Sequence, residues 1–115
     1  MIENYEVRRG DIVYATAGVV GAHIQKNNRP YLILSNDFCN KYGNVVVGIP
    51  FTTAKKNLLP THYRFFWNRR YNIALCEQPT LICKDDITEF KDVINKKHLA
   101  EIEKRVKLQL GLKGE

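Results

Sequence analysis

The apolar positions of the chain form short runs, separated by single glycine, proline and asparagine residues. The runs at 11–15, 30–35, 45–49, 62–67 and 73–76 have the length and the β-branched and aromatic content of strands. The run at 30–35 is almost continuously apolar, which is typical of a strand buried on both faces. Because proline cannot donate to a sheet ladder, Pro50 is expected to mark the edge or exit of the 45–49 strand.

Two segments depart from this strand pattern. Residues 18–28 are small and polar and are expected to form a long loop, a kind of segment that often carries function. Between Leu99 and Leu110 apolar residues recur at every third or fourth position, which predicts an amphipathic helix that begins near Asn95 and ends before Gly111. The pattern therefore predicts a mainly β fold with α, a small SH3-like curved β-barrel with a C-terminal helix, as a single domain over 1–115.

Composition limits the classes of protein to which the chain can belong. Its 115 residues are enough for one hydrophobic core without metal or disulfide staples. No apolar stretch approaches the ~20 residues of a membrane-spanning helix, and no export signal is visible, so a cytoplasmic location without membrane contact is expected. Cys39, Cys76 and Cys83 form no C-x-x-C pair, and the histidines lack metal-ligand spacing. We expect reduced thiols, no metal and no cofactor.

The formal net charge of +6 is concentrated in one segment. Residues 51–70 contain five Lys or Arg and no Asp or Glu, interleaved with Tyr63, Phe65, Phe66 and Trp67. Basic residues among aromatic ones suit a polyanion with stackable bases, which points to single-stranded nucleic acid. The other interpretations are that the aromatics belong to the core while the charges keep the protein soluble, or that the patch binds an acidic protein tail.

Several short motifs occur in a specific order. They are Arg9-Gly-Asp-Ile-Val-Tyr14, Arg29-Pro30, Ser35-Asn36, Pro50-Phe-Thr-Thr53, Leu59-Pro60-Thr61-His62 and Glu77-Gln78. From about Arg9 to the C-terminal Leu-Gln-Leu-Gly-Leu, the chain resembles the MazF/PemK-type toxins. The resemblance implies a homodimeric toxin of a type II toxin–antitoxin pair, a sequence-specific endoribonuclease that cuts single-stranded mRNA without metal. It also implies an antitoxin whose acidic segment covers the RNA groove, and indirect DNA contact through the toxin–antitoxin complex.

The resemblance assigns catalytic roles to Arg29 and Thr52, with Thr53 as the nearest rival. A guanidinium can stabilise the extra negative charge of a pentacoordinate phosphorus, and a threonine hydroxyl can donate to a phosphoryl oxygen or orient the attacking 2′-hydroxyl. Neither is a good general base at neutral pH. Where many members have an acidic residue in the loop, this chain has His23, which can take or give a proton near neutrality. The alternative for His23 is a residue without a catalytic role, either exposed in the loop or in contact with an RNA edge.

The remaining candidates are RNA-binding residues. Lys55, Lys56 and Asn57 are expected to position phosphates, and Gln25, His62 and Gln78 are candidates for contacts with base edges. After Glu77-Gln78 the family often has a basic residue, whereas this chain reads Pro79-Thr-Leu-Ile82, so Arg69, Arg70 or Lys84 is expected to supply the missing charge.

One functional alternative remains open from the sequence. Small barrels of this kind also serve as binding modules, so the chain can instead be a non-catalytic SH3-like module, either like a gyrase poison or a degenerate toxin that acts through its partner. The joint presence of Arg29 and Thr52 argues against this alternative, because a binding module does not need that pair.

Overall fold

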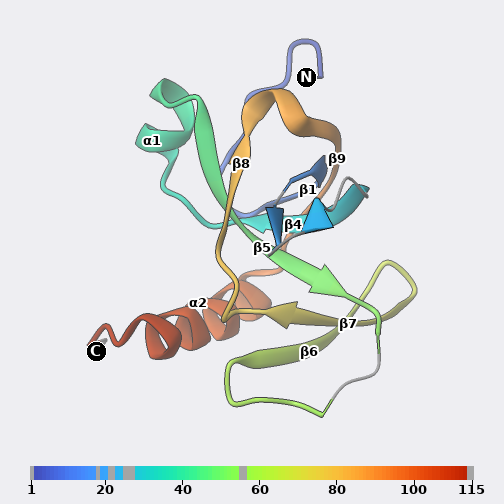
Figure 1. Cartoon of the computed structure of the whole chain (residues 1–115), viewed down its shortest axis with the longest axis vertical. Helices are drawn as coiled ribbons and strands as arrows, with labels where there is room; N and C mark the ends of the chain where they lie inside the picture. Colours follow the sequence, from blue (N-terminus) through green and yellow to red (C-terminus); the bar gives the residue numbers. More distant parts are fainter. Residues whose placement is uncertain (1, 18, 21–22, 25–27, 55–56, 114–115) are drawn as a thin grey trace.

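The computed structural model describes residues 2–17, 19–20, 23–24, 28–54 and 57–113. In chain order the elements are β1 (Asp11–Thr16), β2 (Val19–Val20), β3 (His23–Ile24), β4 (Asn28–Ile33), α1 (Asp37–Tyr42), β5 (Val45–Thr52), β6 (His62–Trp67), β7 (Arg70–Leu75), β8 (Thr80–Cys83), the short 3-10 helix η1 (Lys84–Asp86), β9 (Ile87–Val93) and α2 (Lys96–Leu110). Figure 1 shows β6, β7 and α2 at one end of the molecule, with α1, β8 and β9 towards the other. Among the described residues, no helix has the length and apolar content to span a membrane.

The strands β6-β7-β5-β4-β1-β9 form one antiparallel sheet in that order, and β8 adds to β5. The sheet is strongly curved but not closed, since β6 and β9 lie at its two ends and do not pair with each other. A side-chain contact connects these ends, because the indole N–H of Trp67 on β6 donates to Asp92 on β9 at 3.0 Å. The mainly β fold with a C-terminal helix is confirmed, in the form of an open, barrel-like sheet.

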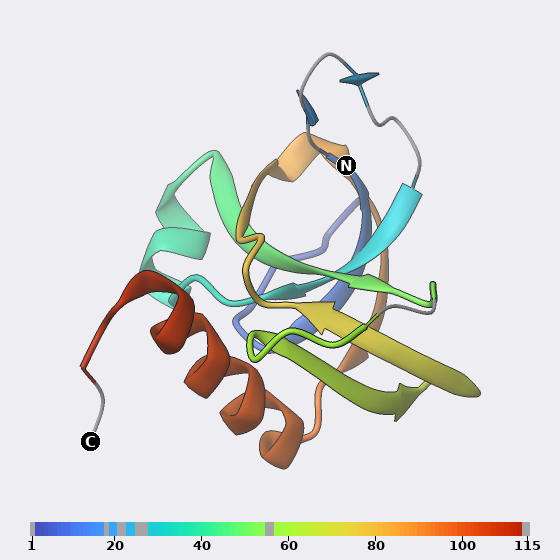
Figure 2. The same ribbon diagram turned by 60° about the horizontal axis from the view of Figure 1, so that its bottom comes forward.

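The central strands are buried on both faces, as the apolar run at 30–35 predicted. Ile12, Leu32 and Ile49 belong to one hydrophobic cluster, which Ile102 and Val106 of α2 cover. Figure 2 shows α2 beside the sheet, on the side of β6. The alternate positions belong to a second cluster, which the N-terminal segment and β8 help to cover; its buried members are Val13, Ala15, Ala17, Tyr31, Ile33, Val46, Ile82 and Ile87.

Local signals determine the ends of α2 as the sequence predicted. The side chain of Asn95 accepts a hydrogen bond from the Lys97 amide at 2.8 Å and caps the first turn. Gly111 follows the last turn with φ of 69°, a left-handed conformation that glycine adopts without steric cost.

Two expectations about the strands were wrong. The 18–28 segment is not only loop, because it contains the short pair β2 and β3, and β4 already begins at Asn28. Pro50 does not mark the edge or exit of its strand, since β5 continues to Thr52 and Pro50 is buried. The ladder to β8 ends at Gly48 and the ladder to β7 begins at Phe51. Pro50 therefore occupies the place where the neighbouring strand changes, and its missing N–H breaks neither ladder.

Candidate functional site

The pairing of β4 with β5 brings Arg29 close to Thr52. The two strands pair through Tyr31–Pro50, Leu32–Ile49 and Ile33–Gly48. Arg29 and Thr52 each lie two residues beyond the Tyr31–Pro50 pair, Arg29 towards the start of β4 and Thr52 at the end of β5. Both residues line a cavity of about 330 Å³, which we call the Arg29 pocket; its other lining residues are Tyr14, Pro30, Phe51, Thr53, Trp67, Asn68, Arg70 and Asn72.

The far wall of the Arg29 pocket comes from the hairpin of β6 and β7. The rings of Phe51 and Trp67 pack edge to face with centroids 5.9 Å apart. Buried Asn72 donates from Nδ2 to the carbonyls of Trp67 at 2.8 Å and Arg70 at 3.1 Å, which holds the two strands together at the turn. Since Asn68 follows Trp67 directly, these contacts position both Asn68 and Arg70 at the pocket.

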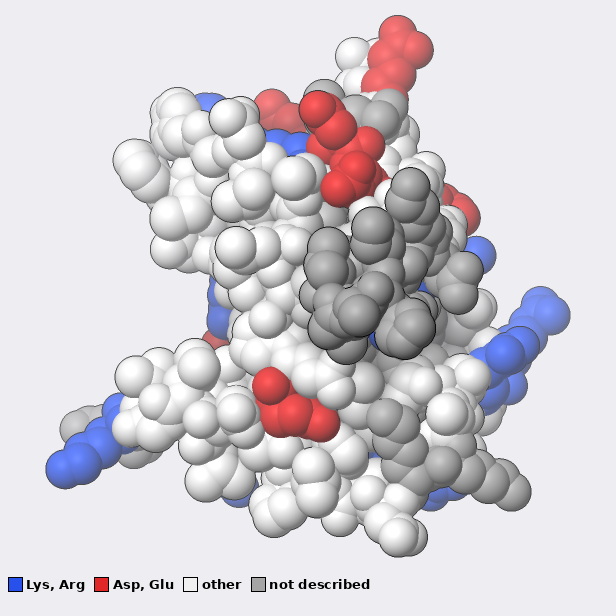
Figure 3. Space-filling model, in the orientation of Figure 1, with Lys and Arg blue, Asp and Glu red and all other residues white. Residues whose placement is uncertain are grey.

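The Arg29 pocket is positively charged. Two guanidinium groups, those of Arg29 and Arg70, line it, and none of its described lining residues is acidic. Burial raises the pKa of the neighbouring Tyr31 hydroxyl, and the charge of Arg29 partly opposes this shift. Figure 3 shows Lys and Arg side chains at the tip of the β6–β7 hairpin, whereas acidic side chains gather near η1 and β9. The pocket is thus suited to an anionic group such as a phosphodiester.

The hydroxyl group of Thr52 is oriented by a hydrogen bond from the main chain. Its Oγ1 accepts a hydrogen bond from the Ala54 amide at 3.2 Å. Because a hydroxyl group has one proton to donate and this bond uses only a lone pair, the proton remains available for a ligand in the pocket. Arg29 and Thr52 therefore offer a cation and a neutral donor side by side.

Comparison with known proteins identifies the family. The sequence profile described as "PemK-like, MazF-like toxin of type II toxin-antitoxin system" matches residues 8–110. The chain belongs to this toxin family. It is 28% identical over 111 residues to "Endoribonuclease MazF" of Staphylococcus saprophyticus, covering 92% of both chains. It is also 26% identical over 111 residues to "Endoribonuclease EndoA" of Bacillus subtilis, covering 92% of this chain and 96% of the relative.

Solved structures agree with the MazF-like fold. MazF from Deinococcus radiodurans superposes with a TM-score of 0.81 at 20% identity, covering 95% of this chain and all of the other (100%). A mycobacterial endoribonuclease in complex with its cognate antitoxin gives a TM-score of 0.78 at 18% identity, covering 95% and 99%. The family and fold predicted from the motifs are confirmed, and the names of the relatives support an endoribonuclease toxin.

The structure of this MazF-like toxin brings together only some of the predicted site residues. Arg29, Thr52, Thr53 and Arg70 line one pocket. Asn57, Arg69 and Gln78 are exposed, but they do not line this pocket. The side chain of His23, and all of Gln25, Lys55 and Lys56, lie outside the described residues, so their assigned roles stay predictions.

His62 is placed differently from the other candidates, because it is buried rather than presented to a ligand. Its Nε2 lies 2.8 Å from Glu77 Oε2, and its Nδ1 accepts from the Leu59 amide at 3.1 Å. Burial is the largest single effect and raises the pKa of Glu77. The hydrogen bond from His62, the charge of His62 and hydrogen bonds from the Glu77 main chain and from Gln78 together outweigh burial and hold that pKa below its ordinary value. With both ring nitrogens in use, His62 has no free atom for a base edge and is better explained as an anchor for the preceding loop.

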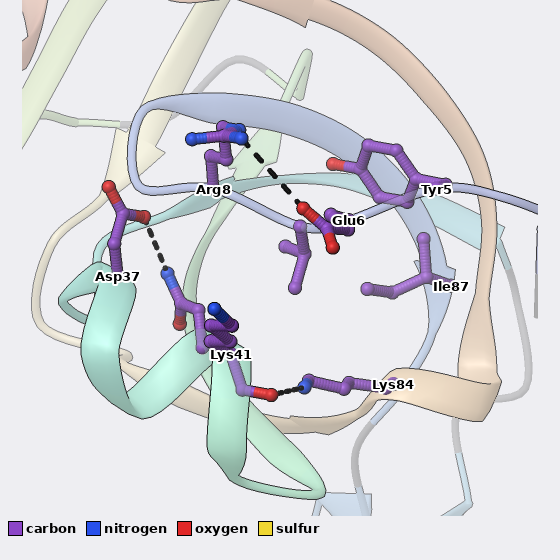
Figure 4. A pocket seen from close by; sticks show the side chains of 9 residues that line it. Tyr5, Glu6, Arg8, Asp37, Lys41, Lys84 and Ile87 are labelled. Carbon is purple, nitrogen blue, oxygen red and sulfur yellow. Dashed lines mark hydrogen bonds and ion pairs between the residues drawn. The ribbon is translucent and has the colours of Figure 1, made fainter.

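A second cavity, of about 290 Å³, lies between the N-terminal segment, α1 and η1 (Figure 4). Several of its charged groups contact other protein groups: Arg8 lies 3.8 Å from Glu6, and Lys84 donates to the Lys41 carbonyl at 3.3 Å. Lys84 lines this cavity and not the Arg29 pocket, so it does not supply the charge expected after Gln78. We therefore place the candidate site at the Arg29 pocket.

Six lining residues of the Arg29 pocket were not predicted as site residues: Tyr14, Pro30, Phe51, Trp67, Asn68 and Asn72. Tyr14 is the last residue of the first motif. Its side chain is only partly buried, whereas its neighbours Val13 and Ala15 on β1 are buried, and this alternation is the signal that could have identified it. Trp67 had been assigned to the basic aromatic segment without a place in the site. Nothing local in the sequence predicts that Asn72 is buried.

Proposed function

We propose that this chain cleaves single-stranded RNA in the Arg29 pocket, without a metal ion, by attack of a ribose 2′-oxygen on the adjacent phosphorus. The observation that carries the proposal is that Arg29 and Thr52 line one pocket together with a second arginine, Arg70, and that none of its described lining residues is acidic. The membership of the toxin family and the endoribonuclease relatives support it.

The chemistry requires stabilisation of charge more than it requires a nucleophile from the protein. The 2′-hydroxyl forms a new bond to phosphorus and loses its proton, while the bond to the 5′-oxygen breaks and that oxygen gains a proton. The products are a 2′,3′-cyclic phosphate and a 5′-hydroxyl, so protons balance. Arg29 stabilises the negative charge on the non-bridging oxygens, and Thr52 donates its free proton to one of them. Arg70 positions the neighbouring phosphate.

The groups that take and give the protons are not part of the described pocket lining. We retain His23 as the proposed proton-transfer residue, since an imidazole titrates near neutrality. The pH–rate profile of His23→Ala tests this role. An unchanged rate and an unchanged acidic limb would remove His23 from the mechanism.

We further propose that the toxin acts as a homodimer in the cytoplasm and that a cognate antitoxin inhibits it. One of the structural relatives is a mycobacterial endoribonuclease in complex with its cognate antitoxin. An acidic antitoxin segment over the basic Arg29 pocket would exclude RNA by occupying the same charges. DNA contact through that toxin–antitoxin complex belongs to the same proposal.

The decisive experiment compares RNA with DNA of the same sequence, both long and single-stranded, in the presence of EDTA. We expect cuts in RNA only, at a recurring short sequence, with 2′,3′-cyclic or 3′-phosphate ends. Arg29→Ala should abolish cleavage while Arg8→Ala, a change at an exposed arginine outside the pocket, should not. Absence of cleavage by the folded, antitoxin-free protein would favour the non-catalytic binding module instead.

A matched pair of substitutions separates Thr52 from Thr53. Thr52→Val keeps the shape but removes the donor, and loss of one donor to a developing oxyanion costs about 10²–10³-fold in kcat. Thr53 also lines the pocket, but its side chain is exposed and, unlike Thr52, no main-chain amide orients its hydroxyl among the described residues. Thr53→Val should therefore cost less than about 10-fold. The opposite order of the two effects would reassign the catalytic role to Thr53.

A further inference from the structure

The outer face of the β6–β7 hairpin presents two aromatic rings and a guanidinium to solvent. Phe66 and Tyr71 are cross-strand partners, 58% and 54% exposed, and their rings meet edge to face with centroids 5.2 Å apart. The guanidinium carbon of Arg64 lies 4.0 Å from the centroid of the Tyr71 ring. We call Arg64, Phe66 and Tyr71 the hairpin outer face.

These three residues are not part of the hydrophobic core. On β6 the alternate positions Tyr63, Phe65 and Trp67 pack against the core cluster, which leaves Arg64 and Phe66 on the other side of the strand. The basic aromatic segment of the sequence is therefore divided between two faces. One face packs against the core, and the other presents the exposed residues Arg64, Phe66 and Tyr71.

The surroundings of the hairpin outer face are basic. Residues 51–76 contain five Lys or Arg and no Asp or Glu. Two of the five, Arg69 and Arg70, lie at the turn that joins β6 to β7. Arg69 has φ of 68°, a left-handed conformation that costs a non-glycine residue of the order of 1 kcal/mol and that glycine would adopt freely. The turn thus carries a cation where local backbone energetics favour glycine.

The hairpin outer face is adjacent to the Arg29 pocket. Trp67 and Arg70, which line the pocket, form the cross-strand pair next to Phe66 and Tyr71. Only the hairpin separates the two surfaces, and its turn carries Arg69. A polyanion that leaves the pocket past this turn meets the guanidinium of Arg69 before it reaches the rings.

We propose that the hairpin outer face is a stacking platform for nucleotides of single-stranded RNA that lie outside the Arg29 pocket. The inference rests on the proposed ribonuclease function and extends its substrate contacts. Every base has a π-face, so the two exposed rings, with the Arg64 guanidinium over that of Tyr71, can stack on bases of any sequence, while Arg64 and Arg69 neutralise phosphates. An acidic protein segment would use the cations, but it has no bases for the rings to stack on.

The test measures the affinity of the full chain for a fluorescent 2′-O-methyl oligouridylate of 20 nucleotides, which lacks the attacking hydroxyl. In the double variant Phe66→Leu/Tyr71→Leu the apolar area is kept but the rings are lost. Loss of a base stack weakens binding about 5-fold or more, so we expect the double variant to bind at least about 10-fold more weakly. Phe66→Trp/Tyr71→Trp should bind at least as tightly as the wild type.

A matched control is available on α1. Phe38 and Tyr42 are also exposed, at 73% and 68%, with ring centroids 5.0 Å apart, but they are not part of the basic hairpin. Phe38→Leu/Tyr42→Leu should stay within about 2-fold of the wild-type affinity, since it removes no ring from the platform. Equal weakening by both double variants, or no weakening by either, would overturn the proposal.

Salt dependence and an acidic peptide separate the remaining interpretations. The ring variants should keep the wild-type slope of log affinity against log salt, whereas Arg64→Gln should reduce it by about 0.7. If the ring variants instead lose only binding of a 20-residue oligoglutamate and keep RNA affinity, the face belongs to a protein partner and the proposal fails. Failure of the proposed function is distinct, because wild-type protein would then not cut RNA in EDTA. If the wild-type protein cuts RNA in EDTA but the ring variants bind the oligouridylate as tightly as the wild type, the stacking platform is refuted and the proposed ribonuclease function stands.

Discussion

Replacement of Gly48 by alanine tests how tightly β5 is packed against Tyr31 and Ile82, four residues before Thr52. A Cβ atom at this position would lie 2.6 Å from Cδ1 of Ile82 and 3.0 Å from Cβ of Tyr31. Both neighbours are buried, with 0% and 2% exposure, so neither can swing out into solvent. The φ of Gly48 lies outside the left-handed region, which leaves steric overlap as the reason for a cost.

The magnitude follows from two opposing effects. Overpacking of a well-packed core costs about 1–3 kcal/mol. Alanine also reduces the conformational freedom of the unfolded chain, which stabilises the folded protein by about 0.4–1 kcal/mol. We therefore expect Gly48→Ala to lower the free energy of unfolding by about 1–2 kcal/mol.

Urea denaturation, extrapolated linearly to water, measures this change, and a double-mutant cycle with Ile82→Val identifies its cause. The valine lacks the Cδ1 atom that the new Cβ would meet, and alone it costs about 0.5–1.5 kcal/mol. The double variant should be more stable than the sum of the two single effects predicts, by about 1 kcal/mol. Full stability of Gly48→Ala, or strict additivity in the cycle, would refute the steric explanation.

Three further predictions concern single side chains. Burial raises the pKa of Cys76 to about 12, so iodoacetamide at pH 8 should modify the exposed Cys39 and Cys83 in the native protein and Cys76 only in urea, as mass spectrometry will show. The pKa of Glu77 is held below its ordinary 4.5, so its stabilising contribution is lost as pH falls below that value, and Glu77→Gln should flatten this acid-side loss in urea midpoints. Asn72→Ala should cost about 1–3 kcal/mol, because two turn carbonyls lose their donor, with the unfolding free energy as the readout.

The elements that could be predicted from the sequence are those whose signals are local. The α2 helix has an apolar stripe, the Asn95 cap and Gly111, all within its own residues. By contrast, β9 has a single buried residue, Ile87, among exposed ones, so no alternation marks it as a strand. Its place in the sheet comes from pairing with β1, at a separation in sequence that no local pattern can reveal.

The proposed catalytic pair of the candidate site could be predicted because both residues lie in the ordered sequence motifs. Arg29 and Thr52 were assigned through the ordered motifs, and the register of β4 with β5 supplies a physical reason for their proximity. His62 was also drawn from a motif, but its burial against Glu77 depends on how β6 and β7 pack. Tyr71 was not singled out, because its exposure follows from the face of the hairpin on which it lies.

The register of β4 and β5 connects stability to chemistry in this protein. A slip by one residue would move every side chain of a strand to the opposite face, so the two hydrophobic clusters together resist any pairing other than the observed one. Just beyond the Tyr31–Pro50 pair, the same two strands bring Arg29 and Thr52 into one pocket. The geometry of the proposed catalytic pair is therefore determined by buried residues that never touch RNA. Substitutions such as Gly48→Ala should accordingly reduce the fraction of folded enzyme before they change kcat of the molecules that remain folded.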